Sequence, residues 1–327
     1  MKKENKRGRG MLIFICIVVF LISIIIGIVS KLAIQPSWAK KYSVKWSDDL
    51  GTLYKDISYD DGEANKFDLY LPRDNSKESY GLVVYLHAGG FTQGDKSEDV
   101  EMLSWLCSKG YVAAGINYTL KNETNNKSVL SQSNEIKDAI PKVIEVAEKY
   151  GYHINEMGIA GGSAGHCLAM IYAYRDASSS KVPVKLLFGA VGPSSFYAED
   201  WDVYGFDRDT EEAREGAANL LGVMGGVKLT KEMIEDGSYI EKLKPVSAVM
   251  WVNENAVPSV VAYGKYDKVQ PFKGSQRLLE AYKNYNVDYK YFEASHSGHG
   301  LQNDNKVFKE YMEAVEEYLD KYMPVEK

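Results

Sequence analysis

Residues 161–166 read Gly-Gly-Ser-Ala-Gly-His, and the residues around this stretch decide the fold class. A short apolar run, 157–160, precedes the glycines, and apolar residues at helical spacing follow Ala164. A nucleophile placed between a strand and a helix has an unfavourable backbone conformation at a sharp turn, so its neighbours must be small. The G-x-S-x-G spacing around Ser163 meets this requirement and predicts that the serine is a nucleophile.

Other glycine-rich loops fit this stretch less well. A dinucleotide-binding loop needs G-x-G-x-x-G, and Ser163 occupies its second glycine position. A P-loop ends in Gly-Lys-Ser or Gly-Lys-Thr, and residues 161–166 contain no lysine. The pentapeptide alone also allows the interpretation that this stretch is a tight loop with no catalytic role, because glycine and serine are common in turns.

The chain around this turn alternates predicted strands and helices. Two runs that alternate apolar and polar residues, 54–59 and 66–72, predict a strand pair near a sheet edge. The other strands are expected at 81–87, 111–118, 157–160, 184–191, 258–264 and 288–294, and the helices at 98–108, 135–149, 164–175 and 307–322. Apolar strands separated by amphipathic helices are typical of a mostly parallel sheet covered on both faces. We therefore expect a three-layer α/β domain over residues 52–327.

Residues 197–250 interrupt this alternation. They contain acidic helical material, the sequence GVMGG and a second helix. A separate polar loop is predicted at 122–133, before the helix expected at 135–149. We expect residues 197–250 to be a cap-like insertion over one end of the sheet. Its apolar residues suggest a wall of the substrate site, formed by Trp201, Tyr204, Phe206 and Met224.

A serine nucleophile needs a base to take its proton, and the base needs an acid to orient it. Of the five histidines, His299 lies between glycines after the last predicted strand, and His296 is the substitute candidate. Asp267 follows a predicted buried strand, at the end of the strand where active sites of open α/β sheets gather. The chain order Ser163, Asp267, His299 is that of one triad architecture and not of the others.

A tetrahedral intermediate also needs N–H donors for its oxyanion. The loop His87-Ala88-Gly89-Gly90-Phe91 follows a predicted buried strand, and glycine allows the backbone to approach a substrate closely. We therefore expect the N–H groups of Gly89, Gly90 and Ala164 to form the oxyanion hole.

Together these residues resemble the esterase and lipase family of the α/β-hydrolase fold, which includes hormone-sensitive-lipase-like and feruloyl- or acetyl-esterase-like carboxylesterases. The similarity extends over about residues 52–327. It rests on segments in family order: HAGGF (87–91), QGD (93–95), NYTL (117–120), GGSAG (161–165), GKYDKVQP (264–271) and SGHG (297–300). The resemblance implies Ser163 as nucleophile, His299 as base and then acid, and Asp267 as its orienting partner, with no metal or organic cofactor.

The sequence departs from that family at three positions. Ala88 replaces the first glycine of the oxyanion loop, and Asn117 stands where the family has a carboxylate, so Asn117 receives no catalytic role. His166 stands where many relatives have a glycine. Helix packing, a polar contact to the acyl pocket and no role all stay open for His166, and packing is the favoured interpretation. It is not expected to be the base.

The N-terminal segment predicts a membrane anchor. Residues 11–29 contain no charge, and their length suffices to cross a bilayer. We expect a cytoplasmic basic segment (1–10), a single-pass transmembrane signal anchor (11–30), a linker (31–51) and a catalytic domain outside the cell. A cleaved signal with a small-x-small site at Ser37-Trp38-Ala39, giving a secreted protein, and a buried core helix are the alternatives.

Charge and cysteine content exclude other classes. The formal net charge is −6, and residues 1–10 carry five basic residues against one acidic residue, so the rest of the chain has a net charge of about −10 and no basic face for nucleic acid is expected. The three cysteines, Cys16, Cys107 and Cys167, lack metal-site or disulfide spacing.

The resemblance implies a serine carboxylesterase for small or carbohydrate-linked acyl esters, acting through an acyl-enzyme on Ser163, and the uncharged run at 11–29 adds the expected membrane anchor. Two alternatives stay open. A prolyl-oligopeptidase-like serine peptidase has the same triad order, but such enzymes carry a large N-terminal domain for which residues 31–51 leave no room. A catalytically inactive binding protein of the same fold would not need the intact set of triad residues.

Overall fold

The computed structural model describes residue 19 and residues 38–325. The predicted basic segment (1–10) and nearly all of the predicted anchor (11–30) lie outside these residues. Within the described part, no helix has the length and apolar character needed to span a membrane. The anchor and the extracellular location stay predictions. The chain divides into two compact units, Met1–Ser43 and Val44–Lys327.

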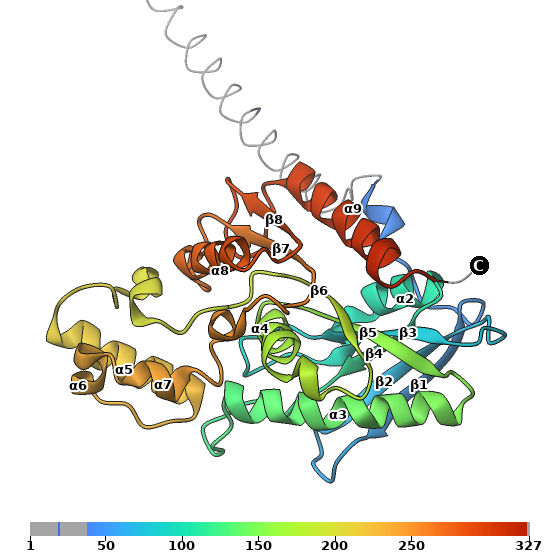
Figure 1. Ribbon diagram of the computed structural model, residues 1–327, viewed down its shortest axis with the longest axis horizontal. Coiled ribbons are helices and arrows are strands. Elements are labelled where there is room, and N and C mark those ends of the chain that lie inside the picture. The colour runs from blue at the N-terminus through green and yellow to red at the C-terminus, as the bar shows by residue number, and fades with distance from the viewer. Residues whose placement is uncertain (1–18, 20–37, 326–327) are drawn as a thin grey trace, which may run out of the picture. The chain divides into compact units, whose positions relative to one another are not determined.

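An eight-stranded sheet forms the centre of the second unit (Figure 1). Its strands are β1 (Gly51–Ser58), β2 (Lys66–Pro72), β3 (Tyr80–Leu86), β4 (Val112–Ile116), β5 (Ile154–Gly162), β6 (Val184–Ala190), β7 (Ser259–Gly264) and β8 (Tyr289–Ala294). They lie in the order β1-β2-β4-β3-β5-β6-β7-β8. β2 is antiparallel to both of its neighbours, and the other pairs are parallel. The mostly parallel sheet predicted from the sequence is confirmed, with each strand within three residues of its expected bounds.

Helices cover both faces of the sheet, as the three-layer prediction requires. The helices are α2 (Val100–Ser108), α3 (Val129–Lys149), α4 (Ala164–Ile171), α8 (Phe272–Asn284) and α9 (Asn305–Tyr322). Buried residues of α3, α4 and α8 share one hydrophobic cluster with strand residues such as Ile159 and Val261. α2 lies on the opposite face, where Leu103 packs against Gly115 of β4. Figure 1 shows α2 and α9 together on the side of the sheet away from α3.

Helix α3 begins six residues before the predicted start at Glu135. The Ser128 hydroxyl accepts a hydrogen bond from the Ser131 N–H, and the Ser131 hydroxyl accepts one from the Ser128 N–H. This reciprocal capping box satisfies two N–H groups that the helix itself leaves unpaired. The predicted loop at 122–133 is therefore wrong from Val129 onward. The polar composition around Ser128 and Ser131 is typical of a loop, but these two serines cap the start of a helix.

The predicted insertion lies between β6 and β7. It contains α5 (Glu211–Gly225), α6 (Lys231–Asp236) and α7 (Tyr239–Leu243), which Figure 1 shows grouped beside the N-terminal end of α3. Gly237 has a φ of 77°, so it ends α6 in the left-handed conformation and separates it from α7.

The four residues of the predicted apolar wall lie in two parts of the insertion. The Tyr204 ring contacts the ring of Trp201 on one side and that of Phe206 on the other, and Trp201 is buried. Met224 lies on α5. That these residues line a substrate site stays a prediction.

Candidate active site

Ser163 occupies a sharp turn between β5 and α4. Its φ of 49° and ψ of −115° are unusual for a residue with a side chain. The turn depends on close approach of strand and helix, because a Cβ on Gly165 would lie 1.9 Å from the Leu86 carbonyl oxygen. A Cβ on Gly161 would lie 2.5 Å from the carbonyl carbon of Gly165. The glycines therefore allow the strained backbone that presents Ser163 at the C-terminal end of β5.

The structure brings Ser163, His299 and Asp267 together at this edge. The Ser163 Oγ lies 2.8 Å from the His299 Nε2, and the His299 Nδ1 lies 2.7 Å from the Asp267 Oδ2. Asp267 follows β7 and His299 follows β8. Because β5, β7 and β8 are parallel members of one sheet, their C-terminal ends lie at the same edge.

Two backbone groups hold the Asp267 carboxylate. Its Oδ1 accepts hydrogen bonds from the N–H groups of Val269, at 2.8 Å, and Gln270, at 2.9 Å. The Asp267 side chain is 2% exposed, whereas that of His299 is 28% exposed. With Oδ2 facing the imidazole, the Nδ1 of His299 donates to the carboxylate, and the Nε2 is left to accept the proton of Ser163.

The substitute base, His296, lies in a different set of contacts. Its Nδ1 is 3.0 Å from the Asp304 Oδ1 and 3.3 Å from the Ser295 Oγ, and its side chain is 77% exposed. A single nitrogen contacts both the acid and the hydroxyl. This arrangement cannot relay a proton from serine through opposite sides of the ring, as the arrangement at His299 can.

The glycine-rich loop after β3 presents free N–H groups. Gly89 has a φ of 119°, and its carbonyl accepts hydrogen bonds from Thr92 and Gln93 in a tight turn. Within residues 38–325, the N–H groups of Gly89 and Gly90 donate to no protein acceptor. Ala164 is the first residue of α4, so its N–H has no acceptor within the helix. No acceptor in residues 38–325 is therefore found for any of the three predicted donors, and their role in an oxyanion hole stays a prediction.

Two residues that sequence reasoning left without a role support this loop. The Tyr118 hydroxyl donates to the His87 carbonyl at 2.9 Å, and its ring stacks on the His87 imidazole with centroids 4.3 Å apart. The Gln132 Nε2 donates to the Phe91 carbonyl at 2.9 Å. Tyr118 lies in the NYTL segment (117–120), one of the segments that resemble the family, so its importance could have been inferred from the sequence. Gln132 lies in the predicted loop at 122–133, where no sequence pattern marked it.

His166 packs against the end of β6. Its Nδ1 accepts a hydrogen bond from the Gly192 N–H at 3.0 Å, and its side chain is buried. A Cβ on Gly189 would lie 2.4 Å from the imidazole. Burial lowers the pKa of His166 to about 3, so the ring is neutral. These contacts fit the packing interpretation, since the ring is engaged with the end of β6.

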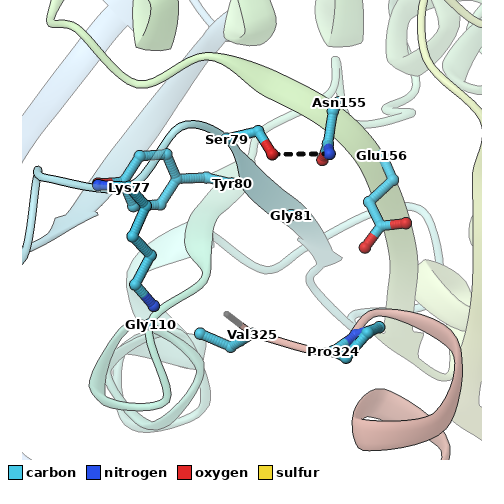
Figure 2. Close-up of a pocket in the computed structure, with 9 residues that line it drawn as sticks. All are labelled: Lys77, Ser79, Tyr80, Gly81, Gly110, Asn155, Glu156, Pro324 and Val325. Carbon is cyan, nitrogen blue, oxygen red and sulfur yellow. Dashed lines mark hydrogen bonds between the residues drawn. The ribbon is translucent and has the colours of Figure 1, made fainter. Parts of the chain in front are cut away.

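A cavity of about 270 Å³ lies at the opposite edge of the sheet (Figure 2). Its lining comes from the starts of β3 and β5 and from Pro324 and Val325, and Figure 2 shows Ser79 hydrogen-bonded to Asn155 beside it. None of the triad residues lines this cavity. Because catalytic groups of parallel sheets gather at the C-terminal ends of strands, we assign the active site to the Ser163 edge.

The part of the chain that the structure describes contains no group of three or more His, Cys, Asp or Glu side chains that could hold a metal ion. Cys107 and Cys167 are buried free thiols. Burial raises the pKa of Cys107 to about 12 and also raises that of Cys167, so neither is poised as a thiolate nucleophile.

Gly89→Ala should disrupt the oxyanion loop far more than Gly90→Ala. A Cβ at Gly89 would lie 1.9 Å from the Gln93 carbonyl oxygen, whereas one at Gly90 would meet nothing within 4 Å. The φ of 60° at Gly90 lies in the left-handed region that alanine can adopt, whereas the φ of 119° at Gly89 lies outside it, so the clash and the backbone strain both act on Gly89→Ala. We expect Gly89→Ala to lower the free energy of unfolding by about 2–4 kcal/mol and Gly90→Ala by about 1 kcal/mol, measured by chemical denaturation. Equal losses in the two variants would contradict this account of the loop.

Comparison with known proteins places these features in context. The family described as BD-FAE matches residues 67–282. Kynurenine formamidase of Salmo salar is 32% identical over 123 residues, which are 37% of this chain and 39% of that protein. Esterase LipC of Mycobacterium tuberculosis (strain ATCC 25618 / H37Rv) is 22% identical over 257 residues, covering 75% of this chain and 59% of that protein. The chain thus matches less than two thirds of the length of either relative.

Solved structures show the same architecture. A truncated form of a carbohydrate esterase from gut microbiota has a TM-score of 0.65 and 19% sequence identity, covering 84% of this chain and 98% of that one. At this identity the similarity concerns the fold. This similarity confirms the predicted α/β-hydrolase fold with its mostly parallel sheet and flanking helices, and the predicted transmembrane helix stays a prediction.

Proposed function

This chain belongs to the BD-FAE family, and from that membership we propose that it is a serine carboxylesterase that hydrolyses small or carbohydrate-linked acyl esters. The observation that carries the proposal is the unbroken contact from the Ser163 Oγ through both nitrogens of His299 to the buried Asp267. The names of similar proteins, a carbohydrate esterase and Esterase LipC, support ester substrates.

The proposed reaction proceeds through an acyl-enzyme. The Ser163 Oγ bonds to the ester carbonyl carbon while the His299 Nε2 takes its proton, and Asp267 stabilises the resulting imidazolium. The carbonyl oxygen gains negative charge and accepts hydrogen bonds from the N–H groups of Gly89, Gly90 and Ala164. His299 then gives the proton to the alcohol oxygen as the carbon–oxygen bond breaks. Water, deprotonated by His299, attacks the acyl-enzyme, and the acid leaves as Ser163 recovers its proton.

Reaction with a fluorophosphonate probe tests whether the site is catalytic. We expect the purified full chain to be labelled covalently and the label to map to Ser163. An unlabelled full chain that is folded would favour the inactive binding protein. Labelling at another serine would show an active hydrolase whose nucleophile we have misassigned.

A substrate panel then tests the class of bond. It should contain p-nitrophenyl acetate, butyrate and octanoate, an acetylated sugar, an aryl formamide and a dipeptide amide. We expect kcat/KM for p-nitrophenyl acetate or the acetylated sugar to exceed that for the dipeptide amide by at least about 10³-fold, because an amide carbonyl is less electrophilic than an ester carbonyl and an amine leaves less readily than an alcohol. Preference for the dipeptide amide would support the peptidase, and preference for the formamide would follow the activity named for the formamidase relative.

A further inference from the structure

The first part of the insertion is tied to the loop that carries Asp267. The Tyr204 hydroxyl donates a hydrogen bond to the Val269 carbonyl at 3.0 Å. The Lys273 Nζ, in the first turn of α8, lies 3.4 Å from an Asp202 carboxylate oxygen and 3.1 Å from one of Asp207. These contacts, together with the ion pairs of Arg277 with Glu199 and Asp200, join the segment that follows β6 to the segment that follows β7.

The hydrogen bond from Tyr204 continues directly into the triad. The N–H of Val269, the residue whose carbonyl Tyr204 holds, donates to the Asp267 Oδ1 at 2.8 Å. The other carboxylate oxygen of Asp267 faces His299, which contacts Ser163. Hydrogen bonds and one short stretch of backbone thus join Tyr204 to the nucleophile without a gap.

Tyr204 is itself held in place. Its ring lies 5.6 Å from that of Trp201 and 5.8 Å from that of Phe206, measured between centroids. The indole N–H of the buried Trp201 donates to the Ser195 carbonyl at 3.0 Å, which anchors one end of this group of rings, whereas Tyr204 is 45% exposed. Partial burial and the nearby Asp267 raise the pKa of Tyr204, so its hydroxyl keeps the proton that it donates.

We propose that Tyr204 is a positioning residue for the acid of the triad, through which the insertion holds Asp267 against His299. This inference rests on the proposed serine hydrolase function. Tyr204 acts on the placement of the carboxylate, and catalysis is sensitive to small displacements of such a group. The insertion would then contribute to turnover itself, in addition to any contact it makes with substrate.

The chain offers a matched control in Tyr266. It directly precedes Asp267 and is 63% exposed, and within residues 38–325 its hydroxyl makes no hydrogen bond. Tyr204→Phe and Tyr266→Phe each remove one hydroxyl beside the same loop, but only Tyr204→Phe removes a bond to it. Lys273→Met is a second comparison, since it breaks the two ion pairs of the same contact and leaves the hydroxyl.

The test measures kcat and KM of the full chain on p-nitrophenyl acetate, together with the rate of fluorophosphonate labelling. For Tyr204→Phe we expect kcat and the labelling rate to fall about three- to tenfold, with KM within about twofold of the wild type, as for the loss of one neutral hydrogen bond that orients a catalytic group. Tyr266→Phe and Lys273→Met should keep kcat within about twofold.

Other outcomes overturn the proposal. An unchanged kcat in Tyr204→Phe would show that the bond does not position Asp267. A raised KM with unchanged kcat would make Tyr204 a substrate contact. An equal loss of kcat in Lys273→Met would show that any weakened contact between the segment after β6 and the loop of Asp267 lowers kcat, so that the effect is not specific to the Tyr204 hydrogen bond. A wild-type chain that neither labels nor hydrolyses esters would instead refute the proposed function.

Discussion

Ser163→Ala is expected to lower kcat/KM for p-nitrophenyl acetate by about 10⁴- to 10⁶-fold and to abolish fluorophosphonate labelling. The His299 Nε2 then has no serine hydroxyl from which to take a proton. The residual rate would come from the oxyanion donors and from binding. The substitution keeps the backbone N–H of residue 163, which donates to the Ala190 carbonyl at 2.9 Å. We therefore expect the melting temperature to stay close to that of the wild type.

Ser295→Ala is the matched control for this experiment. Ser295 also lies beside a histidine, since its Oγ is 3.3 Å from the His296 Nδ1. We expect it to keep full activity and labelling, because its histidine partner contacts the acid and the hydroxyl through one nitrogen. A Ser163→Ala variant that retained a tenth of the wild-type kcat/KM would refute the assignment of the nucleophile.

Asp267→Asn is expected to lower kcat by about 10³- to 10⁴-fold without unfolding the protein. The two backbone N–H groups of Val269 and Gln270 both donate to Oδ1. An asparagine must place its oxygen there, which turns its NH₂ group toward His299. The Nδ1 of His299 would then accept a hydrogen bond and the Nε2 would carry the proton, so the Nε2 could not accept the proton of Ser163.

Asp288→Asn is the control for the loss of a hydrogen-bonded carboxylate. Asp288 precedes β8 and accepts hydrogen bonds from Tyr318 and Lys321, which lower the pKa of its carboxyl to about 2. Its location at the opposite edge from the triad predicts a change in stability with kcat unchanged. An Asp267→Asn variant with less than a tenfold loss in kcat would assign the orienting role to another group.

The triad could be named from sequence because its signals are local. Ser163 needs small neighbours in the chain, and Asp267 and His299 each follow a strand that its own apolar run reveals. The strand bounds were predictable for the same reason. The start of α3 was not, because a helix capped by Ser128 and Ser131 has the composition of a loop.

Residues that support the site were less accessible to sequence reasoning. Gln132 and Tyr204 act through carbonyl groups that lie 41 and 65 positions away in the chain. Every residue has a backbone carbonyl, so the residue type at a position does not indicate that its carbonyl accepts a hydrogen bond from a distant side chain. His166 shows the converse, since it lies close to Ser163 in sequence, packing was its favoured interpretation, and its buried ring contacts Gly192.

The sequence by itself determined the nucleophile turn, the three-layer class and the order of the candidate triad. Short-range sterics and apolar periodicity act within a few residues, so they can be read directly from the chain. Only the tertiary structure decided that the Asp267 carboxylate is held by Val269 and Gln270, that Tyr204 reaches the same loop, and that the buried His166 ring contacts Gly192. These depend on which strands and loops become neighbours in the sheet, and that order is set by the packing of the whole domain.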